Sequence, residues 1–268
     1  MKSSYAEVRR ACLKPDENEK PWYPRHITHA ISTRLVWLLQ DLPLTPNILT
    51  TASLLAALAA LPYFARFSPG SLLTGALFVE LYYVLDAVDG QWARFKNQRS
   101  LTGAFFDVLI NYAIQPPILF ALAWGVYLAS GDAEFLLLGF LAAFSTLWLL
   151  LIWNIRAAVL LAHLGSLNRA PAKPVKGAQK TSASKTSPIK WLFGWFHKSM
   201  VFPWFMYVLT VTSLVSFAGA AWFAMPELPL NAFKAFLLYY SFGGLFIAFA
   251  LTVSWIAGRK IESSPELG

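Results

Sequence analysis

Long apolar stretches, separated by short polar segments, dominate the chain. Six of them are long enough to cross a bilayer, because a transmembrane helix needs about 20 mostly apolar residues. We place these spans at residues 46–66, 71–89, 102–128, 134–163, 201–225 and 232–257. The pattern therefore predicts an all-α integral membrane protein with six transmembrane helices.

A shorter amphipathic pattern precedes the first span. Between residues 26 and 41, apolar side chains recur at helical spacing, at Ile27, Ile31, Leu35 and Leu38. Such a pattern is typical of a helix that lies on the membrane surface. A helix packed against the transmembrane bundle fits the same spacing, so both interpretations stay open.

Polar composition marks the segments that flank or interrupt the membrane domain. Residues 1–44 form an N-terminal segment that holds the amphipathic helix, and residues 259–268 form a tail. The six-helix domain occupies residues 45–258. Within it, residues 169–190 are rich in Lys, Ala, Pro, Ser and Thr and have no apolar period, so we predict a flexible basic loop there.

Basic residues are distributed unevenly between the two sides of the predicted bundle. Nineteen of the 22 Lys and Arg residues lie in the N-terminal segment, in the loops after the second and fourth spans, or in the tail. Cytoplasmic loops carry such an excess of Lys and Arg. We therefore predict that both termini are cytoplasmic, which agrees with the even number of spans.

Composition excludes several other classes of protein. Hydrophobic residues make up 57% of the chain and charged residues only 13%, whereas a soluble domain carries roughly 25% charged residues. The net charge of +8 comes mainly from membrane-flanking segments, which excludes a nucleic-acid-binding fold. The single cysteine, Cys12, leaves no internal disulfide.

Acidic residues gather where the second span meets the third. Asp86 and Asp89 share one helical face near the end of the second span, and Asp107 begins the third, with Asn111 one turn further on. Ionised side chains within spans are costly and usually mark function. Converging carboxylates repel one another unless a cation neutralises them, and oxygen ligands favour Mg²⁺, Mn²⁺ or Ca²⁺. We therefore predict a metal site.

Two glycines and an arginine accompany these acids. We expect Gly90 to end the second span at a turn where a ligand can approach closely. Gly103 opens the next helix, where backbone N–H groups favour an anion, and Arg94 offers forked donors to phosphate oxygens. Together they predict a diphosphate site that faces the cytoplasm.

The segment resembles the signature of the class I CDP-alcohol phosphotransferases, or CDP-alcohol phosphatidyltransferases, D-x2-D-G-x2-A-R-x8-G-x3-D-x3-D. Seven of its eight fixed positions are present at the correct spacing, at Asp86, Asp89, Gly90, Ala93, Arg94, Gly103 and Asp107. The stretch from Thr45 to Thr50, which includes Asn47, is similar to the family's P-N-x-x-T element. The six spans also match the family's fold, so the resemblance extends from about residue 30 to the end.

The resemblance implies a metal-dependent transferase with two ions, Mg²⁺ or Mn²⁺. Their ligands would come from the positions of Asp86, Asp89, Asp107 and Asn111. An acceptor hydroxyl would attack the β-phosphorus of a CDP-alcohol and release CMP, while Arg94 helps to neutralise the developing charge. The residues implied to line or adjoin the cytidine pocket are Gly90, Ala93, Gly103, Asn47 and Thr50.

The family's biology supplies further expectations. Phospholipid synthesis from CDP-diacylglycerol is the commonest use of such a site, and a soluble CDP-alcohol or a lipid acceptor are alternatives. The resemblance also implies a homodimer, in the inner membrane of a bacterium or archaeon. A cation transporter would instead carry its acids near the middle of the membrane, whereas these acids lie at the cytoplasmic end.

The sequence departs from the signature at Asn111, where the family has an aspartate that acts as general base and helps to bind metal. An amide oxygen can ligate a cation, but an amide cannot take a proton at neutral pH. Three interpretations stay open. Asn111 is an introduced change that holds substrate without turnover, another group is the base, or the chain binds CDP and metal without catalysis.

The acceptor pocket has weaker signals. Asn154 and Arg156 lie near the cytoplasmic end of the fourth span, and Lys198 precedes the fifth, so these three are candidates for binding a phosphorylated or acidic acceptor. An arginine within a span needs a functional reason. Glu80 points to a different face of its helix from Asp86, so we do not include it in the metal site.

Overall fold

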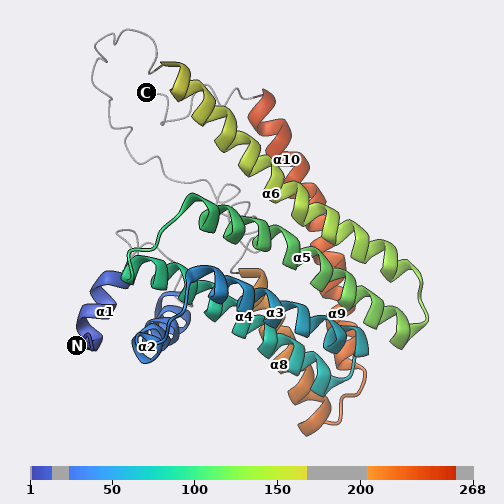
Figure 1. Ribbon diagram of the computed structural model, residues 1–268. Helices are drawn as coiled ribbons and strands as arrows, with labels where there is room; N and C mark the ends of the chain where they lie inside the picture. The colour runs from blue at the N-terminus through green and yellow to red at the C-terminus, as the bar shows by residue number, and fades with distance from the viewer. Residues whose placement is uncertain (1, 14–23, 168–203, 258–268) are drawn as a thin grey trace, which may run out of the picture.

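The computed structural model describes residues 2–13, 24–167 and 204–257, and every regular element in these ranges is helical (Figure 1). In chain order the helices are α1 (Tyr5–Cys12), the π-helical turn η2 (Pro24–Thr28), α2 (His29–Leu39), α3 (Pro46–Arg66), α4 (Pro69–Phe95), α5 (Leu101–Ser130), α6 (Glu134–Leu167), α8 (Trp204–Trp222), α9 (Leu228–Leu238), the π-helical turn η3 (Tyr239–Gly243) and α10 (Gly244–Ala257). The predicted basic loop at 169–190, Lys198 and the tail lie outside the described residues.

Within the described residues, six helical stretches are long and apolar enough to cross a membrane, which confirms the predicted multi-pass integral membrane protein. They are Pro46–Arg66, Pro69–Phe95, Leu101–Ser130, Glu134–His163, Phe205–Trp222 and Leu228–Ala257. The last stretch joins α9, η3 and α10 into one span. Ser241 in η3 donates to the Leu138 carbonyl, and Ser145 of α6 donates to the Tyr240 carbonyl, so side chains bridge the π-turn to α6.

Local sequence signals fix the antiparallel hairpin of α3 and α4. Thr45 caps the start of α3, with Pro46 at the first helical position, where a missing N–H costs nothing. The helix ends at Phe67, which adopts a left-handed conformation (φ 49°), and Ser68 immediately caps α4. Gly75 lets the two helices approach closely, because a Cβ atom there would lie 2.9 Å from the Phe64 ring.

The prediction that Gly90 ends the second span at a turn is wrong. Helix α4 continues through Gly90 to Phe95. Tertiary contacts hold this last turn: Gln91 accepts a hydrogen bond from Thr33, and the indole N–H of buried Trp92 donates to the Leu44 carbonyl at 3.1 Å. These contacts offset the roughly 1 kcal/mol that glycine costs within a helix.

Helix α2 confirms one interpretation of the amphipathic pattern, that of a helix packed against the bundle. It packs against α4 through a small, mostly polar face in which Ser32, Thr33 and Val36 are buried. Its opposite face carries the apolar side chains of Ile31 and Leu38, which are 43% and 57% exposed. Packing against the bundle is therefore shown, while contact of the exposed apolar face with the membrane surface stays a prediction.

A small second core surrounds the end of α4, apart from the main core of the bundle. Its buried members come from α1, α2, α3 and α4, and they are Val8, Cys12, Val36, Leu49, Val88 and Trp92. Helix α1 was not expected, although a capping box between Ser4 and Glu7 marks its start. This core places α1 beside the predicted functional residues.

Candidate active site

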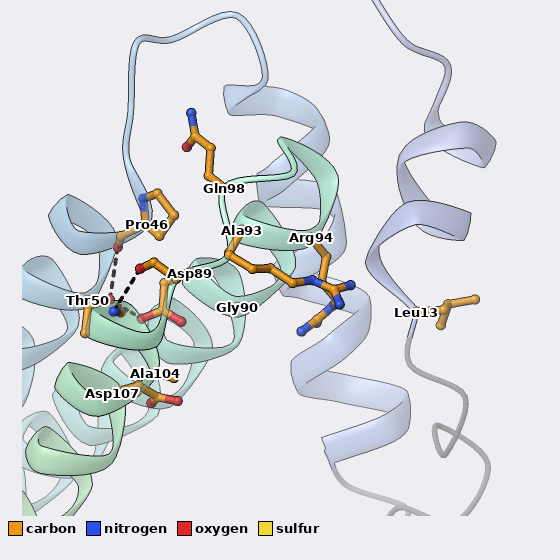
Figure 2. Close-up of a pocket in the computed structure, with 13 residues that line it drawn as sticks. Leu13, Pro46, Thr50, Asp89, Gly90, Ala93, Arg94, Gln98, Ala104 and Asp107 are labelled. Atoms are coloured by element: carbon orange, nitrogen blue, oxygen red, sulfur yellow. Dashed lines mark hydrogen bonds between the residues drawn. The ribbon is translucent and has the colours of Figure 1, made fainter.

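A cavity of about 400 Å³ opens where α3, α4, α5 and the end of α1 meet (Figure 2). Seven of the predicted site residues line it, namely Thr50, Asp89, Gly90, Ala93, Arg94, Gly103 and Asp107. The remaining lining residues are Leu13, Pro46, Gln98, Arg99, Ser100 and Ala104. Residues far apart in the sequence therefore meet in one cavity that offers both carboxylates and guanidinium groups.

Asp89 is the most buried carboxylate of this cavity, with 5% of its surface exposed. Its Oδ2 atom accepts a hydrogen bond from the Thr50 hydroxyl at 2.5 Å, and the same hydroxyl lies 2.9 Å from the Pro46 carbonyl. Figure 2 shows Asp89 of α4 and Thr50 of α3 pointing toward each other. A buried carboxylate needs such a partner, so the P-N-x-x-T element of α3 orients an acid of the α4 motif.

Arg94 extends from α4 toward the side of the cavity where Leu13 lies (Figure 2). Its Nε–H donates to the Cys12 carbonyl at 2.8 Å. A Cβ atom on Gly90 would lie 3.4 Å from an Nη atom of Arg94. This is an ordinary van der Waals distance, so Gly90 lies beside the guanidinium, but the Arg94 contact does not by itself require glycine.

Gly103 forms a tight part of the cavity wall near the start of α5. A Cβ atom there would lie 3.0 Å from Ser100 Oγ and 3.6 Å from Asn47 Oδ1, so Asn47 is a neighbour of the cavity although it does not line it. The backbone N–H of Gly103 donates to Ser100 Oγ, the N-terminal cap of α5. Helix α5 begins at Leu101, two residues before Gly103. The Gly103 N–H, which the sequence predicts to face an anion, donates to the Ser100 hydroxyl oxygen instead.

Asn111 bridges Asp107 and Tyr82. Its amide nitrogen donates to Asp107 Oδ1 at 3.2 Å and to the Asp107 carbonyl at 3.1 Å. Its side-chain oxygen accepts a hydrogen bond from the Tyr82 hydroxyl at 2.6 Å. Sequence reasoning missed Tyr82, although it lies one helical turn before Asp86 on the same face of α4.

Asp86 lies outside the lining of the cavity and is half-buried. Asp86, Asp89 and Asp107 each lie near enough to Tyr82 to interact electrostatically with its hydroxyl. Within the described residues, no three His, Cys, Asp or Glu side chains are arranged as ligands of one metal ion. Carboxylate oxygens are ligands that a hard divalent cation prefers. Asp86, which does not line the cavity, would have to move toward Asp89 and Asp107 to complete a three-carboxylate site.

Of the candidate acceptor residues, Asn154 and Arg156 are described by the structure, and neither lines this cavity. Asn154 of α6 donates hydrogen bonds to the Tyr112 hydroxyl and the Leu150 carbonyl. The Arg156 guanidinium stacks over the rings of Trp153 and Trp255, at 5.9 Å and 5.5 Å from their centroids. A third candidate, Lys198, lies outside the described residues.

Glu80 belongs to a different part of the bundle from the candidate site. Its Oε1 atom accepts a hydrogen bond from Thr210 of α8 at 2.6 Å. Glu80 does not line the cavity, whereas Asp89 on the same helix does. It therefore serves as a matched acidic residue for comparison with the motif acids.

Comparison with known proteins identifies the family. The model of the CDP-alcohol phosphatidyltransferase family matches residues 43–215, which is more than half of the chain. The chain belongs to this family. The match includes the α3 element and every position of the α4–α5 motif, but not helix α1.

Two known proteins are similar to this chain, one in sequence over a short stretch and one in fold. The archaetidylinositol phosphate synthase of Aeropyrum pernix is 48% identical over 62 residues, which are 23% of this chain and 30% of that protein. The Mycobacterium tuberculosis phosphatidylinositol phosphate synthase, solved with CDP-DAG bound, has a similar fold. Its TM-score is 0.53 at 15% identity, over 89% of this chain and 95% of that one.

Proposed function

We propose that the protein is a CDP-alcohol phosphotransferase that moves a phosphatidyl group from CDP-diacylglycerol to an alcohol during phospholipid synthesis. The observation that carries the proposal is the single cavity shared by Asp89, Asp107 and Arg94. Carboxylates and a guanidinium group in one cavity suit a metal-bridged diphosphate. The two similar proteins are named as an archaetidylinositol phosphate synthase and a phosphatidylinositol phosphate synthase.

The proposed reaction is a displacement at the β-phosphorus. The acceptor oxygen forms a new bond to this phosphorus and gives up its proton, while the bond to the α-phosphate oxygen breaks and CMP leaves with the electron pair. Arg94 binds the diphosphate, and Thr50 keeps Asp89 oriented toward it. Oxygens of Asp86, Asp89 and Asp107 would hold Mg²⁺ or Mn²⁺, which would neutralise charge at the phosphates.

A second candidate function follows from Asn111. Its amide donates to Asp107 and its oxygen accepts from Tyr82, so no proton acceptor stands at this position. The second candidate is therefore a chain that binds CDP and a divalent cation with impaired or absent turnover. The two candidates share the donor site and differ in the release of CMP.

Membrane placement and assembly complete the proposal. The active site faces the cytoplasm, since the loops beside the motif carry the excess of Lys and Arg. The host is a bacterium or an archaeon, and the protein acts as a homodimer. A prokaryotic host and a homodimer are what the family resemblance implies for this chain.

The test is CMP release by the purified full-length protein in lipid, with CDP-diacylglycerol, Mg²⁺ or Mn²⁺ and a panel of polyols and phosphorylated polyols. Asp89→Asn should abolish release, because it removes a charge from the cavity. Glu80→Gln is the matched control on α4 and should keep the wild-type rate, because Glu80 bonds to Thr210. CDP binding without CMP release favours the second candidate, and absence of metal-dependent CDP binding contradicts both.

A further inference from the structure

Helix α1 reaches the cavity from outside the part of the chain that the family model matches. Leu13, at its C-terminal cap, lines the cavity together with Arg94. The carbonyl of Cys12 accepts the Nε–H of Arg94 at 2.8 Å, across 82 positions of sequence. The last turn of α1 therefore holds one donor of the guanidinium group that we assign to the diphosphate.

Docking of α1 depends on tertiary contacts. The helix has eight residues, and isolated helices of this length are unstable in water. Val8 and Cys12 are buried in the second core, against side chains that include Val36 and Trp92. The Cys12 thiol also donates to the Gln91 carbonyl at 3.7 Å, which ties α1 to the same turn of α4.

The start of α1 is fixed as well. The backbone N–H of Ser3 donates to Gln40 Oε1 at 2.8 Å, and the Trp37 indole N–H donates to the Ser3 carbonyl at 3.2 Å. The capping box of Ser4 and Glu7 satisfies backbone donors of the first turn. Helix α1 is thus held at both ends, by α2 at its start and by α4 at its end.

We propose that α1 positions Arg94 and closes one side of the nucleotide pocket, so that docking of α1 and binding of a cytidine diphosphate group stabilise each other. This inference rests on the proposed function, since its ligand is the CDP moiety of the donor. When α1 undocks, Arg94 regains rotamer freedom and Leu13 no longer lines the cavity. Both changes weaken binding of the CDP moiety. Coupling between two such events is reciprocal.

The native thiol reports docking directly. Cys12 is the chain's single cysteine and is 2% exposed, so its reaction with a maleimide requires α1 to move away. The experiment measures the rate of Cys12 labelling and the Kd for CDP on the full-length protein in lipid with Mg²⁺. We expect CDP to slow the labelling of the wild type, while Mg²⁺ alone leaves the rate nearly unchanged.

Two variants test the direction of the coupling. Val8→Ser removes buried apolar atoms from α1 and should accelerate labelling while raising the Kd for CDP on the order of 10-fold, within the usual range for coupled sites. Ala6→Ser is the matched control, because Ala6 is exposed on the same helix, and it should change neither quantity. Faster labelling of the Val8→Ser protein with a wild-type Kd for CDP overturns the inference.

Arg94→Lys tests the contact between Arg94 and α1 by changing α4, and it leaves the buried apolar side chains unchanged. Lysine keeps the positive charge but lacks the Nε–H donor to the Cys12 carbonyl. We expect faster labelling of Cys12 in this variant before any nucleotide is added, and an unchanged rate overturns the link. Absence of CDP binding to the wild type contradicts the proposed function itself, whereas CDP binding that ignores the state of α1 contradicts this inference alone.

Discussion

The Asn111 amide nitrogen donates a hydrogen bond to Asp107 Oδ1 at 3.2 Å, and this contact fixes the orientation of the amide group. The same nitrogen donates to the Asp107 backbone carbonyl at 3.1 Å, and a carbonyl oxygen only accepts, so the NH₂ group must face Asp107. The Asn111 oxygen is then the atom that accepts from Tyr82. A neutral bridge therefore stands where the family signature places a second carboxylate beside Asp107.

Asn111→Asp should make stability depend strongly on a divalent cation. Two carboxylates about 4 Å apart repel by about 4 kcal/mol at an effective dielectric of 20 and by about 1 kcal/mol in water. We expect a lower melting temperature than wild type without metal, and a larger rise on addition of Mg²⁺ or Mn²⁺. Asn231→Asp, at an exposed position on α9, is the control and should respond to metal as the wild type does.

The same substitution should raise turnover. If position 111 is where the acceptor's proton is taken, restoring a carboxylate there returns a general base that contributes about 10²–10⁴-fold in rate. Donor affinity should stay near its wild-type value, because Asn111 does not line the cavity. The measurement is CMP release at saturating metal, with the Kd for CDP determined separately. Equal or lower turnover shows that this chain uses a different base or a different reaction.

Tyr82→Phe should destabilise the bridge without weakening donor binding. The substitution removes the hydroxyl that donates to Asn111 at 2.6 Å and leaves a partly buried oxygen without this partner, which costs about 1–3 kcal/mol. Unfolding in detergent measures the loss for Tyr82→Phe alone and in an Asn111→Ala background. A loss of the same size in both backgrounds contradicts the bridge, because the cost then does not depend on Asn111.

Much of the fold follows from the sequence because length and apolar content alone identify a membrane span. The range predicted for the first span agrees with α3 because Thr45 and Pro46 are visible start signals. The same approach misses α1, which is too short to register as an apolar stretch. It also misplaces the end of α4, because the contacts that hold Gln91 and Trp92 in the helix come from distant residues.

The candidate site shows the same division between local and distant information. The motif spacing predicts which side chains converge, and six of its seven matched positions line one cavity together with Thr50 of α3, whereas Asp86 does not. Arg94 donates a hydrogen bond to the backbone carbonyl of Cys12. Every residue type has this carbonyl, so the sequence at position 12 does not predict the contact. The hydroxyl of Tyr82 is likewise a polar group within a largely apolar helix, and its bond to Asn111 is visible in the structure but not in the sequence.

Topology is testable with single cysteines in a Cys12→Ser background. Ala133→Cys, in the turn between α5 and α6, should react with a membrane-impermeant maleimide on intact cells. Lys180→Cys, within the predicted basic loop, should react only after lysis, because the excess of Lys and Arg assigns this loop to the cytoplasm. Labelling of position 180 on intact cells contradicts the predicted orientation.

Docking of α1 should weaken at alkaline pH. Burial raises the pKa of the Cys12 thiol from its ordinary 9.0 to about 11, and the nearby Arg94 charge offsets this only in part. Because the pKa is higher in the docked state, the undocked chain loses its proton first as pH rises, so docking is fully favoured below about pH 9 and weakens between pH 9 and 11. Maleimide labelling of Cys12 should therefore reach its half-maximal rate at a higher pH than labelling of Ala133→Cys in the Cys12→Ser background, where the thiol is exposed. Coincident pH profiles for the two thiols contradict a buried Cys12 and, with it, the docked position of α1.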